Sequence, residues 1–288
     1  MTFADKISYA VVDSFTAVPF AGNPAAVVVL PGPEYPADDV LLKLAREFNL
    51  SETAFLIRRS AADYRLRWFT PTIEINLCGH ATLAPAHFLF TTKAVASTET
   101  IRFETLSGEL TAKPLSDGKI ELNFPDDVAT EVTDKAQREN AAAAVGVPAE
   151  KMAYLGKRRG GLLIELTPDV EIETVVPDLQ IMVTLDANTV IVTTAPAPNH
   201  RAVGRQFVSR VFAPKIGIAE DPVTGAAHCS LGPYWSQKLG LEGKTLNAYQ
   251  ASVRGGSVDV TWDKAAGRVR LGGNAVTVAT GEMLWPKA

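Results

Sequence analysis

Only two cysteines, Cys78 and Cys229, occur among the 288 residues of the chain. So few thiols argue against the disulfide scaffold of a small secreted domain. No apolar run approaches the roughly 20 residues that a membrane-spanning helix needs, and the first residues form too short and too interrupted a run for a signal peptide. We therefore expect a cytoplasmic protein that has no membrane partner.

Strongly basic segments are also missing. The formal net charge is −4 and the sequence pI is about 5.7. The densest cationic cluster, Lys157 to Arg159, fits a solvated loop beside a Gly-Gly turn, so nucleic acid is not an expected partner. The chain has no phosphate-binding loop and no dinucleotide fingerprint, and its histidines and cysteines show no usual metal-ligand spacing. These absences predict no dinucleotide cofactor and no metal.

What the chain has in abundance is apolar and β-branched sequence. Residues 7–15, 24–30 and 51–57 are rich in such side chains and predict strands. Residues 36–49 instead space their apolar side chains at helical intervals, with acidic residues near the start and Asn49 at the end, which favours a helix. Strand patterns recur in both halves of the chain.

One predicted helix differs from the others. Residues 79–90 are apolar on nearly every side, which indicates a helix that is buried all round. Pro85 lies within this segment and removes one backbone donor from it. We therefore expect either a kink at Pro85 or a helix that begins later than Gly79.

The two halves of the chain share a sequence pattern. Residues 67–75 are RWFTPTIEI and residues 210–218 are RVFAPKIGI, so both copies are R-x-F-x-P-x-I-x-I and they start almost half the chain apart. Each copy is followed by a Gly-x-Ala sequence that opens an apolar segment, at Gly79 and at Gly225. A repeat as long as a domain predicts a duplication, with the same local structure in both copies.

The paired helix starts have chemical consequences. A helix start exposes backbone N–H groups and the positive end of the helix dipole, and a glycine there lets an anion approach closely. If two such starts, at Gly79 and Gly225, face one cleft, the cleft suits chemistry that needs a group on each side of one carbon. Racemisation and proton-shift isomerisation are both of this kind, and the pattern alone does not choose between them.

Several longer motifs, spread over the whole chain, together resemble one protein family. In chain order they are DSFTAVPFAGNPAAVVVL (13–30), LAREFNLSETAFL (44–56), RWFTPTIEINLCGHATLA (67–84), FAPKIGIAEDPVTGAAHCSL (212–231), YWSQKLG (234–240) and GGNAVTV (272–278). With these motifs the chain resembles the PhzF family of phenazine biosynthesis-like proteins, which belongs with diaminopimelate epimerase and proline racemase.

The resemblance implies a fold and an activity. The fold is α+β, with two pseudo-symmetric domains that are each a rolled β-sheet around a central helix. We expect the first domain to comprise residues 1–124 and 276–288, and the second to comprise residues 125–275. The implied activity is a cofactor-independent isomerisation of a small organic acid, and the implied assembly is a homodimer.

The resemblance also implies roles for individual residues. Glu52, in SETAF, corresponds to the general acid/base of the family, since a positioned carboxylate can relay a proton. His80 would hydrogen-bond substrate or carry a proton. Asp221, in EDPVTG, would face the same cleft from the second domain. Without the family, Glu52 would be a solvated strand-edge residue and Asp221 a helix cap.

Four further residues are expected to bind substrate: Asn23, Gly79, Gly225 and Ala226. The two glycines would cradle a carboxylate with their amides. Many family members carry a serine where this chain has Ala226. A side-chain hydrogen bond is therefore missing here, so the phenazine-pathway substrate does not transfer directly.

The two cysteines raise the question of a thiol mechanism. The epimerase relatives use one cysteine from each half, and Cys78 lies where the first of these would be. The equivalent place in the second half is within DPVTG, which has no cysteine, and Cys229 lies one helical turn further along. Free cysteines are often buried packing residues, so we expect neither thiol to be catalytic.

Two alternative functions stay open at this point. One is an amino-acid epimerase or racemase that uses the same site and exchanges hydrogen at a stereocentre without moving a double bond. The other is a binding or interaction protein with this fold and little turnover, which the change to Ala226 would allow.

Overall fold

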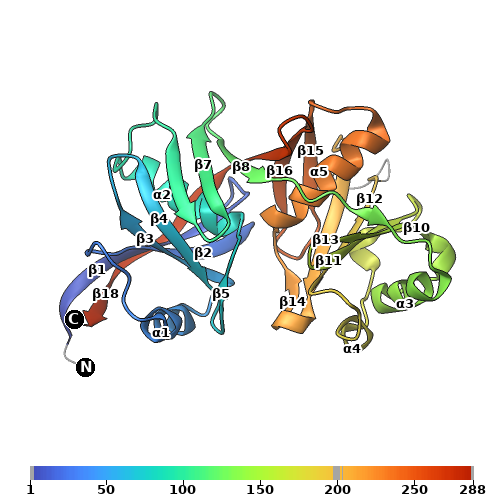
Figure 1. The fold of residues 1–288 in the computed structure, drawn as a ribbon, viewed down its shortest axis with the longest axis horizontal. Helices are drawn as coiled ribbons and strands as arrows, with labels where there is room; N and C mark the ends of the chain where they lie inside the picture. The colour runs from blue at the N-terminus through green and yellow to red at the C-terminus, as the bar shows by residue number, and fades with distance from the viewer. Residues whose placement is uncertain (1–2, 197–201, 203, 287–288) are drawn as a thin grey trace. The chain divides into compact units, whose positions relative to one another are not determined.

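The computed structural model describes residues 3–196, 202 and 204–286, and it divides into two compact units (Figure 1). The first unit comprises Met1–Phe124 and Gly272–Ala288, and the second comprises Pro125–Leu271. The chain returns to the first unit at Gly272, earlier than the predicted 276. The reason is packing, since a Cβ added to Gly273 would lie 2.5 Å from the Phe15 ring.

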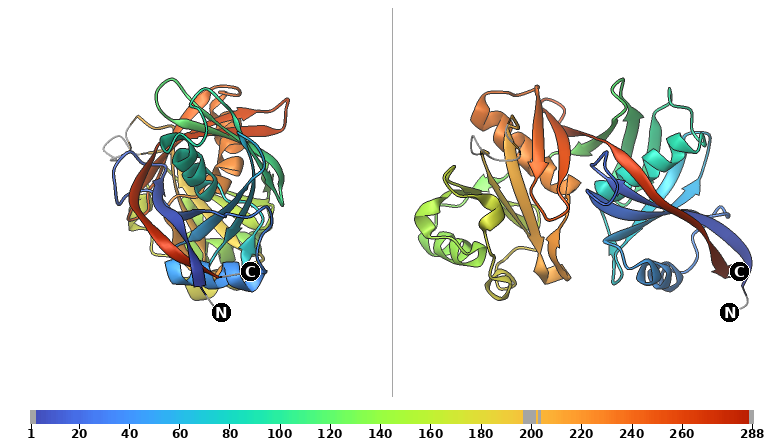
Figure 2. Two further views of the ribbon diagram at one scale, coloured as in Figure 1. Left: turned by 90° about the vertical axis from the view of Figure 1, so that its left-hand side faces the viewer. Right: turned by 180° about the vertical axis from the view of Figure 1, so that it is seen from behind.

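The first unit is built from strands that are mostly antiparallel. Its elements are β1 (Phe3–Ser14), β2 (Asn23–Val29), α1 (Asp38–Phe48), β3 (Glu52–Arg58), β4 (Asp63–Phe69), β5 (Glu74–Ile75), α2 (His80–Thr91), β6 (Ile101–Thr105), β7 (Gly108–Pro114), β8 (Ile120–Pro125) and β18 (Ala275–Pro286). β1 pairs antiparallel with both β2 and β18, so the C-terminal strand completes the N-terminal sheet. Figure 2 (left) shows α2 enclosed by these strands.

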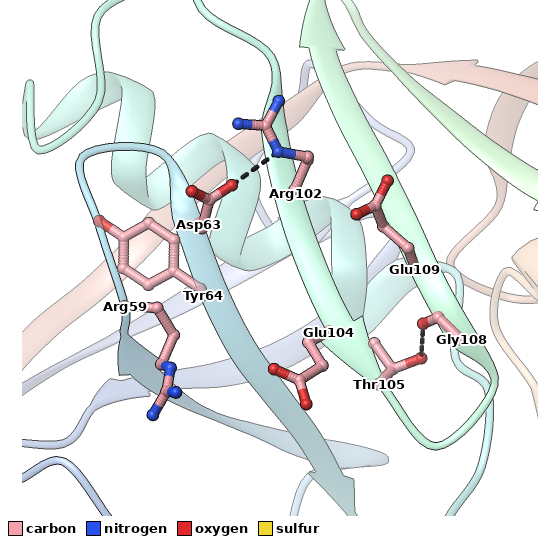
Figure 3. Close-up of a pocket in the computed structure, with 8 residues that line it drawn as sticks. All are labelled: Arg59, Asp63, Tyr64, Arg102, Glu104, Thr105, Gly108 and Glu109. Atoms are coloured by element: carbon pink, nitrogen blue, oxygen red, sulfur yellow. Dashed lines mark hydrogen bonds and ion pairs between the residues drawn. The ribbon is translucent and has the colours of Figure 1, made fainter.

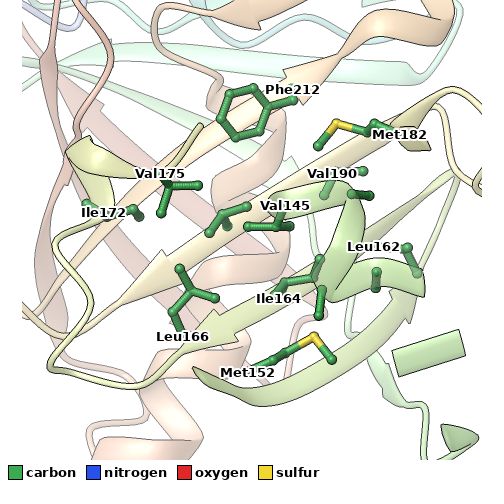
Figure 4. Close-up of a cluster of buried hydrophobic side chains, with 14 of the residues drawn as sticks. Val145, Met152, Leu162, Ile164, Leu166, Ile172, Val175, Met182, Val190 and Phe212 are labelled. Atoms are coloured by element: carbon green, nitrogen blue, oxygen red, sulfur yellow. The ribbon is translucent and has the colours of Figure 1, made fainter. Parts of the chain in front are cut away.

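The second unit has a matching set of elements. They are β9 (Thr130–Glu131), α3 (Lys135–Val145), β10 (Met152–Arg158), β11 (Gly161–Leu166), α4 (Leu179–Met182), β12 (Thr189–Thr194), β13 (Phe207–Ala213), β14 (Ile218–Asp221), α5 (Gly225–Leu239), β15 (Thr245–Gln250), β16 (Gly256–Asp263) and β17 (Arg268–Gly273), with 3₁₀ turns at Ala149–Lys151, Ile172–Thr174 and Pro214–Ile216. Buried side chains of α3 and of β10 to β13 contribute to an apolar cluster of this unit (Figure 4).

The order of strand pairing is the same in both units. β2 and β3 are parallel, as are β11 and β12. β4 pairs antiparallel with β3 and β5 and parallel with β6, while β13 pairs antiparallel with β12 and β14 and parallel with β15. The two units are therefore pseudo-symmetric, as the sequence repeat predicts.

The arginine of the repeated sequence forms a similar ion pair in each unit. Arg67 donates two hydrogen bonds to Glu74, at 2.7 and 2.6 Å, across the β4–β5 turn. Arg210 donates two hydrogen bonds to Glu220, at 2.8 and 2.9 Å, across the β13–β14 turn. Each guanidinium also lies 5.0 Å from the ring of the phenylalanine two residues later in the repeat. The arginine and phenylalanine of the pattern thus brace the strand that leads to each central helix.

Both central helices contain a proline. In each helix, a donor from another segment bonds to the backbone carbonyl that the proline leaves without a helical partner. Pro85 has no N–H for the carbonyl of Ala81, and the indole of Trp68 donates to that carbonyl at 3.0 Å. In α5, Pro233 leaves the carbonyl of Cys229 without its helical partner, and a backbone N–H from the segment before β9 donates to it at 3.0 Å. α2 begins at His80, so the predicted later start is found, one residue after Gly79.

The predicted helix at 36–49 is found as α1. Asp38 and Asp39 lie in its first turn, and Asn49 ends it in the left-handed conformation, with φ of 49°. Its buried residues Leu41 and Ala45 pack against the apolar face of β2, β3 and β4. Among the described residues, none of the helices combines the length and apolarity required to cross a membrane.

Candidate functional site

Glu52 and His80 are brought together because a strand and a helix start at the same place in the first unit. Glu52 is the first residue of β3 and pairs with Ala25 of β2, while His80 is the first residue of α2. The Oε2 atom of Glu52 lies 2.9 Å from Nε2 of His80. The two residues are only 5% and 3% exposed, so this pair is shielded from water.

The other edge of the imidazole faces Asn23 and Cys78. Asn23 Nδ2 lies 3.1 Å from His80 Nδ1, and Cys78 Sγ lies 3.4 Å from the same nitrogen. Ser14 donates a hydrogen bond of 2.8 Å to the carbonyl of His80, and Thr82 donates one to the carbonyl of Cys78. These backbone contacts fix the first turn of α2 and hold the ring between its neighbours.

The electrostatics of the cluster favour a charged imidazole beside a neutral thiol. Burial, together with the nearby Glu52 carboxylate, raises the pKa of the Cys78 thiol to about 11, so the thiol is protonated at neutral pH. Burial alone would lower the pKa of His80, but its contacts with Cys78 and Glu52 raise that pKa well above its ordinary value of 6.5. The contact with Glu52 therefore favours the imidazolium form of His80.

Asn23 can match either protonation state of the ring. With its amide nitrogen towards His80 it donates to a neutral Nδ1, and with the amide turned over its oxygen accepts from a protonated Nδ1. A carboxylate, an imidazole and an amide in contact can therefore take up a proton, hold it and release it without leaving a buried charge unpartnered.

The remaining predicted residues lie in the second unit. Asp221 ends β14, Gly225 is the first residue of α5 and Ala226 follows it. Thr224 donates a hydrogen bond to a carboxylate oxygen of Asp221. Gln250, which is fully buried, accepts from the backbone N–H of Thr224 at 2.8 Å and donates to the backbone carbonyl of Asp221 at 2.7 Å. These contacts tie the DPVT segment to β15.

The acid/base cluster of the first unit has no counterpart at the equivalent positions of the second. Where β3 opens with Glu52, β12 opens with Thr189, whose hydroxyl accepts from Arg158 at 2.8 Å. Taking Gly79 and Gly225 as equivalent, Cys78 corresponds to Thr224. The other thiol, Cys229, is buried within α5, and burial raises its pKa to about 12. The second unit therefore offers no thiol at the place that a two-thiol mechanism requires.

A separate pocket lies on the first unit across β4, β6 and β7 (Figure 3). Its volume is about 330 Å³, and it is lined by Arg59, Asp63, Tyr64, Arg102, Glu104, Thr105, Gly108 and Glu109. Arg102 donates to Asp63 at 2.7 Å, so two of its charges already neutralise each other. It contains none of the predicted site residues, and we assign it no function.

Comparison with known proteins decides the family. A family model described as phenazine biosynthesis-like protein matches residues 12–281. The chain belongs to this family. It is 40% identical over 280 residues to a protein of Halalkalibacterium halodurans named an uncharacterized isomerase, and the match covers 95% of this chain and 97% of that protein. The resemblance drawn from the sequence motifs is therefore confirmed.

Solved structures confirm the predicted fold class of this family member. A crystal structure of a phenazine biosynthesis protein of the PhzF family from Enterococcus faecalis matches with a TM-score of 0.84 and 38% identity, covering 97% of this chain and 99% of that one. A probable proline racemase from Agrobacterium radiobacter matches with a TM-score of 0.64 and 12% identity, covering 96% and 92%. The latter likeness shows the shared fold alone.

Two supporting residues of this phenazine biosynthesis-like protein were not predicted. Ser14 lies in the first quoted motif, two residues before a turn-rich loop, but nothing local marks it as a partner of His80. Gln250 ends a strand 29 residues after Asp221, and only the folded sheet brings the two together. The one signal available was the alternation of β15, which places Gln250 on the same face as Leu246 and Ala248.

His228, on α5, gives a prediction about stability and pH. It is fully buried, its Nδ1 lies 2.9 Å from the carbonyl of Thr224, and no hydrogen bond to its Nε2 is found among the described residues. Burial lowers its pKa to about 4, so the folded protein holds it neutral. An unfolded chain, with a histidine pKa of about 6.5, binds a proton that the fold excludes.

The stability that depends on neutral His228 should therefore be present above pH ~6.5 and be lost as the pH falls towards 4. At pH 5 this loss should be about 2 kcal/mol of the free energy of unfolding. Urea unfolding at pH 7 and pH 5 checks it. His228→Asn should lose less stability over this interval than the unmodified protein, whereas an unchanged pH dependence would show that another group is responsible.

Proposed function

We propose that this protein is a cofactor-independent isomerase that moves a proton on a small organic acid by general acid/base catalysis. The observation that carries the proposal is the buried contact of 2.9 Å between Glu52 and His80 at the start of a central helix. The isomerase name of the Halalkalibacterium halodurans relative supports the reaction type. The protonated thiol of Cys78 fits a packing role and not a nucleophilic one.

In the proposed reaction Glu52 removes a proton from an activated carbon and returns it to another position. Proton removal leaves negative charge on the substrate, and the imidazolium of His80, in contact with Glu52, stabilises it or supplies a proton. The first-turn amides at Gly79 and Gly225 hold a substrate carboxylate. Asn23 adjusts to the protonation state of His80, and Ala226 provides a contact without a hydrogen-bonding side chain.

A panel of amino acids and aromatic or conjugated organic acids, incubated with the protein in heavy water, tests this function. We expect deuterium uptake, read by mass spectrometry, together with a product whose double bond has moved. Uptake with inversion of a stereocentre and no shifted bond would instead indicate an epimerase or racemase. Saturable binding of an acid without any uptake would identify a binding protein and overturn the proposal.

We further propose that Asp221 serves the same reaction from the second unit. Asp221→Asn removes the charge but keeps the size, so uptake should fall by at least ~10-fold while the protein stays folded. The matched control is Asp186→Asn, since the side chain of Asp186 is 93% exposed and forms an ion pair with Lys157 at the surface. Equal activity of the two variants would remove Asp221 from the mechanism.

A further inference from the structure

Three different metal-ligating side chains meet in the candidate site. Glu52, Cys78 and His80 offer a carboxylate oxygen, a sulfur and an imidazole nitrogen, and these atoms all lie within 4.8 Å of one another. All three side chains are buried. The sequence spacing predicts no such cluster, because Glu52 comes from β3 while the other two residues come from the start of α2.

We propose that Glu52, Cys78 and His80 form a binding site for one thiophilic divalent cation, Zn²⁺ above all, which occupies the acid/base groups and inhibits the protein. The binding site stands on the geometry of the three side chains. Its inhibitory effect rests on the proposed function, because the cation would take both groups that we assign to proton transfer.

The donor set fits Zn²⁺ in type and number. Thiolate, imidazole and carboxylate are its three usual protein ligands, and sites with three protein ligands keep a fourth position for water or another small molecule. Sulfur disfavours Mg²⁺ and Ca²⁺, which bind through oxygen. The site should therefore discriminate strongly between these two groups of cations.

The spacing of the donors also fits. In a tetrahedral site with metal–sulfur and metal–nitrogen bonds of ~2.3 and ~2.0 Å, the two ligand atoms lie ~3.5 Å apart. Cys78 Sγ and His80 Nδ1 lie 3.4 Å apart, so a cation can bridge these two atoms with little movement. Glu52 now contacts the opposite nitrogen of the ring, so its carboxylate must move towards the Cys78 side to join the site. The three ligand atoms already lie within 4.8 Å of one another.

Hydrogen bonds hold the backbone of Cys78 and His80, the two ligands whose donor atoms are 3.4 Å apart. The carbonyl of Cys78 accepts from the Thr82 hydroxyl, and the carbonyl of His80 accepts from Ser14. Fixed ligand backbones reduce the rearrangement that binding requires. On binding, the thiol gives its proton to solvent and the sulfur forms the metal bond, while the imidazole binds through its neutral form.

Binding is measured on the full-length protein without reference to activity. The metal-free protein is titrated with Zn²⁺ against a chromophoric chelator, and with Cd²⁺ while the ultraviolet thiolate-to-cadmium absorption band is recorded. We expect one cation per chain, a cadmium band, and no competition by millimolar Mg²⁺. Cys78→Ser should abolish the band and weaken Zn²⁺ binding by at least ~10-fold.

Two further variants keep the test decisive. Cys229→Ser makes the same substitution at the other buried thiol and should leave affinity and band unchanged. Glu52→Gln should weaken Zn²⁺ binding but keep the cadmium band, because it removes one ligand and leaves the thiol in place. This variant tests the site even if Cys78→Ser folds poorly. A band that survives in Cys78→Ser, equal affinity in Cys78→Ser and Cys229→Ser, or displacement by Mg²⁺ would overturn the proposed site.

The inhibitory effect is tested separately. If deuterium uptake is found, Zn²⁺ should suppress it in Cys229→Ser at concentrations that leave Cys78→Ser active, and equal suppression in both would overturn the regulatory part. If no acid shows uptake, the proposed function fails while the binding measurements still decide the metal site. If uptake is found without metal binding, the metal site fails and the proposed function stands.

Discussion

Glu52→Gln should lower deuterium uptake on any accepted acid by roughly 10²–10⁴-fold, the usual contribution of a positioned acid or base. The substitution keeps the shape of the side chain and its place at the start of β3, but it removes the proton acceptor that contacts His80 at 2.9 Å. Single-turnover uptake measured by mass spectrometry, with circular dichroism as a check on folding, gives the result.

The matched comparison is Cys78→Ser, which changes the group on the other edge of the same imidazole. Because the Cys78 thiol is protonated and buried at neutral pH, its loss should leave most activity and cost only a little packing. The reverse pattern, with an inert serine variant and an active glutamine variant, would move the chemistry to the thiol. It would leave Glu52 as a structural partner of His80.

Gln250→Leu should lower the free energy of unfolding by roughly 2–5 kcal/mol. The side chain is fully buried, and its amide makes three hydrogen bonds: it accepts from Thr224 N–H and donates to the Asp221 carbonyl and to the Thr224 hydroxyl. Leucine fills a similar volume but leaves these groups without that partner away from bulk water. Urea unfolding monitored by fluorescence measures the loss.

Gln206→Leu is the control for this substitution. Gln206 lies in the same unit and accepts one backbone N–H, from Asn247, at 2.6 Å. Its replacement should cost about 0.5–1.5 kcal/mol, the usual worth of one hydrogen bond, and should leave deuterium uptake unchanged. If Asp221 takes part in the reaction, Gln250→Leu should reduce uptake in the fraction that remains folded. Equal stability losses in the two variants would show that the DPVT segment does not depend on Gln250.

The elements that local pattern determines were predicted well. The helical spacing of apolar residues and the residues at the two ends predicted α1. Asn49 adopts the left-handed conformation expected at a helix end. The R-x-F-x-P-x-I-x-I repeat revealed the duplication because the arginine and phenylalanine make the same contacts in both units. Because the same residues make the same contacts in each unit, the duplication can be recognised from the sequence alone.

Contacts between distant segments could not be predicted from the residues alone. Ser14 and His80 are 66 positions apart, and nothing near either residue specifies the other. The resemblance to the family supplied Glu52 and His80, but it did not indicate that Cys78 lies on the same imidazole. The meeting of Glu52, Cys78 and His80 depends on where β3 and α2 start relative to each other, which only the folded first unit determines.

The pairing of β18 with β1 has a consequence for the order in which the protein is made. Residues 125–271, which form the second unit, leave the ribosome before β18, whereas the first unit lacks β18 until Ala275–Pro286 have been synthesised. Domains usually complete their folding from the N-terminus during synthesis. Here the N-terminal unit cannot complete its sheet until β18 is synthesised, and one edge of β1 stays unpaired until then. Nascent chains stalled after residue 271 should therefore resist protease in the second unit before they do so in the first.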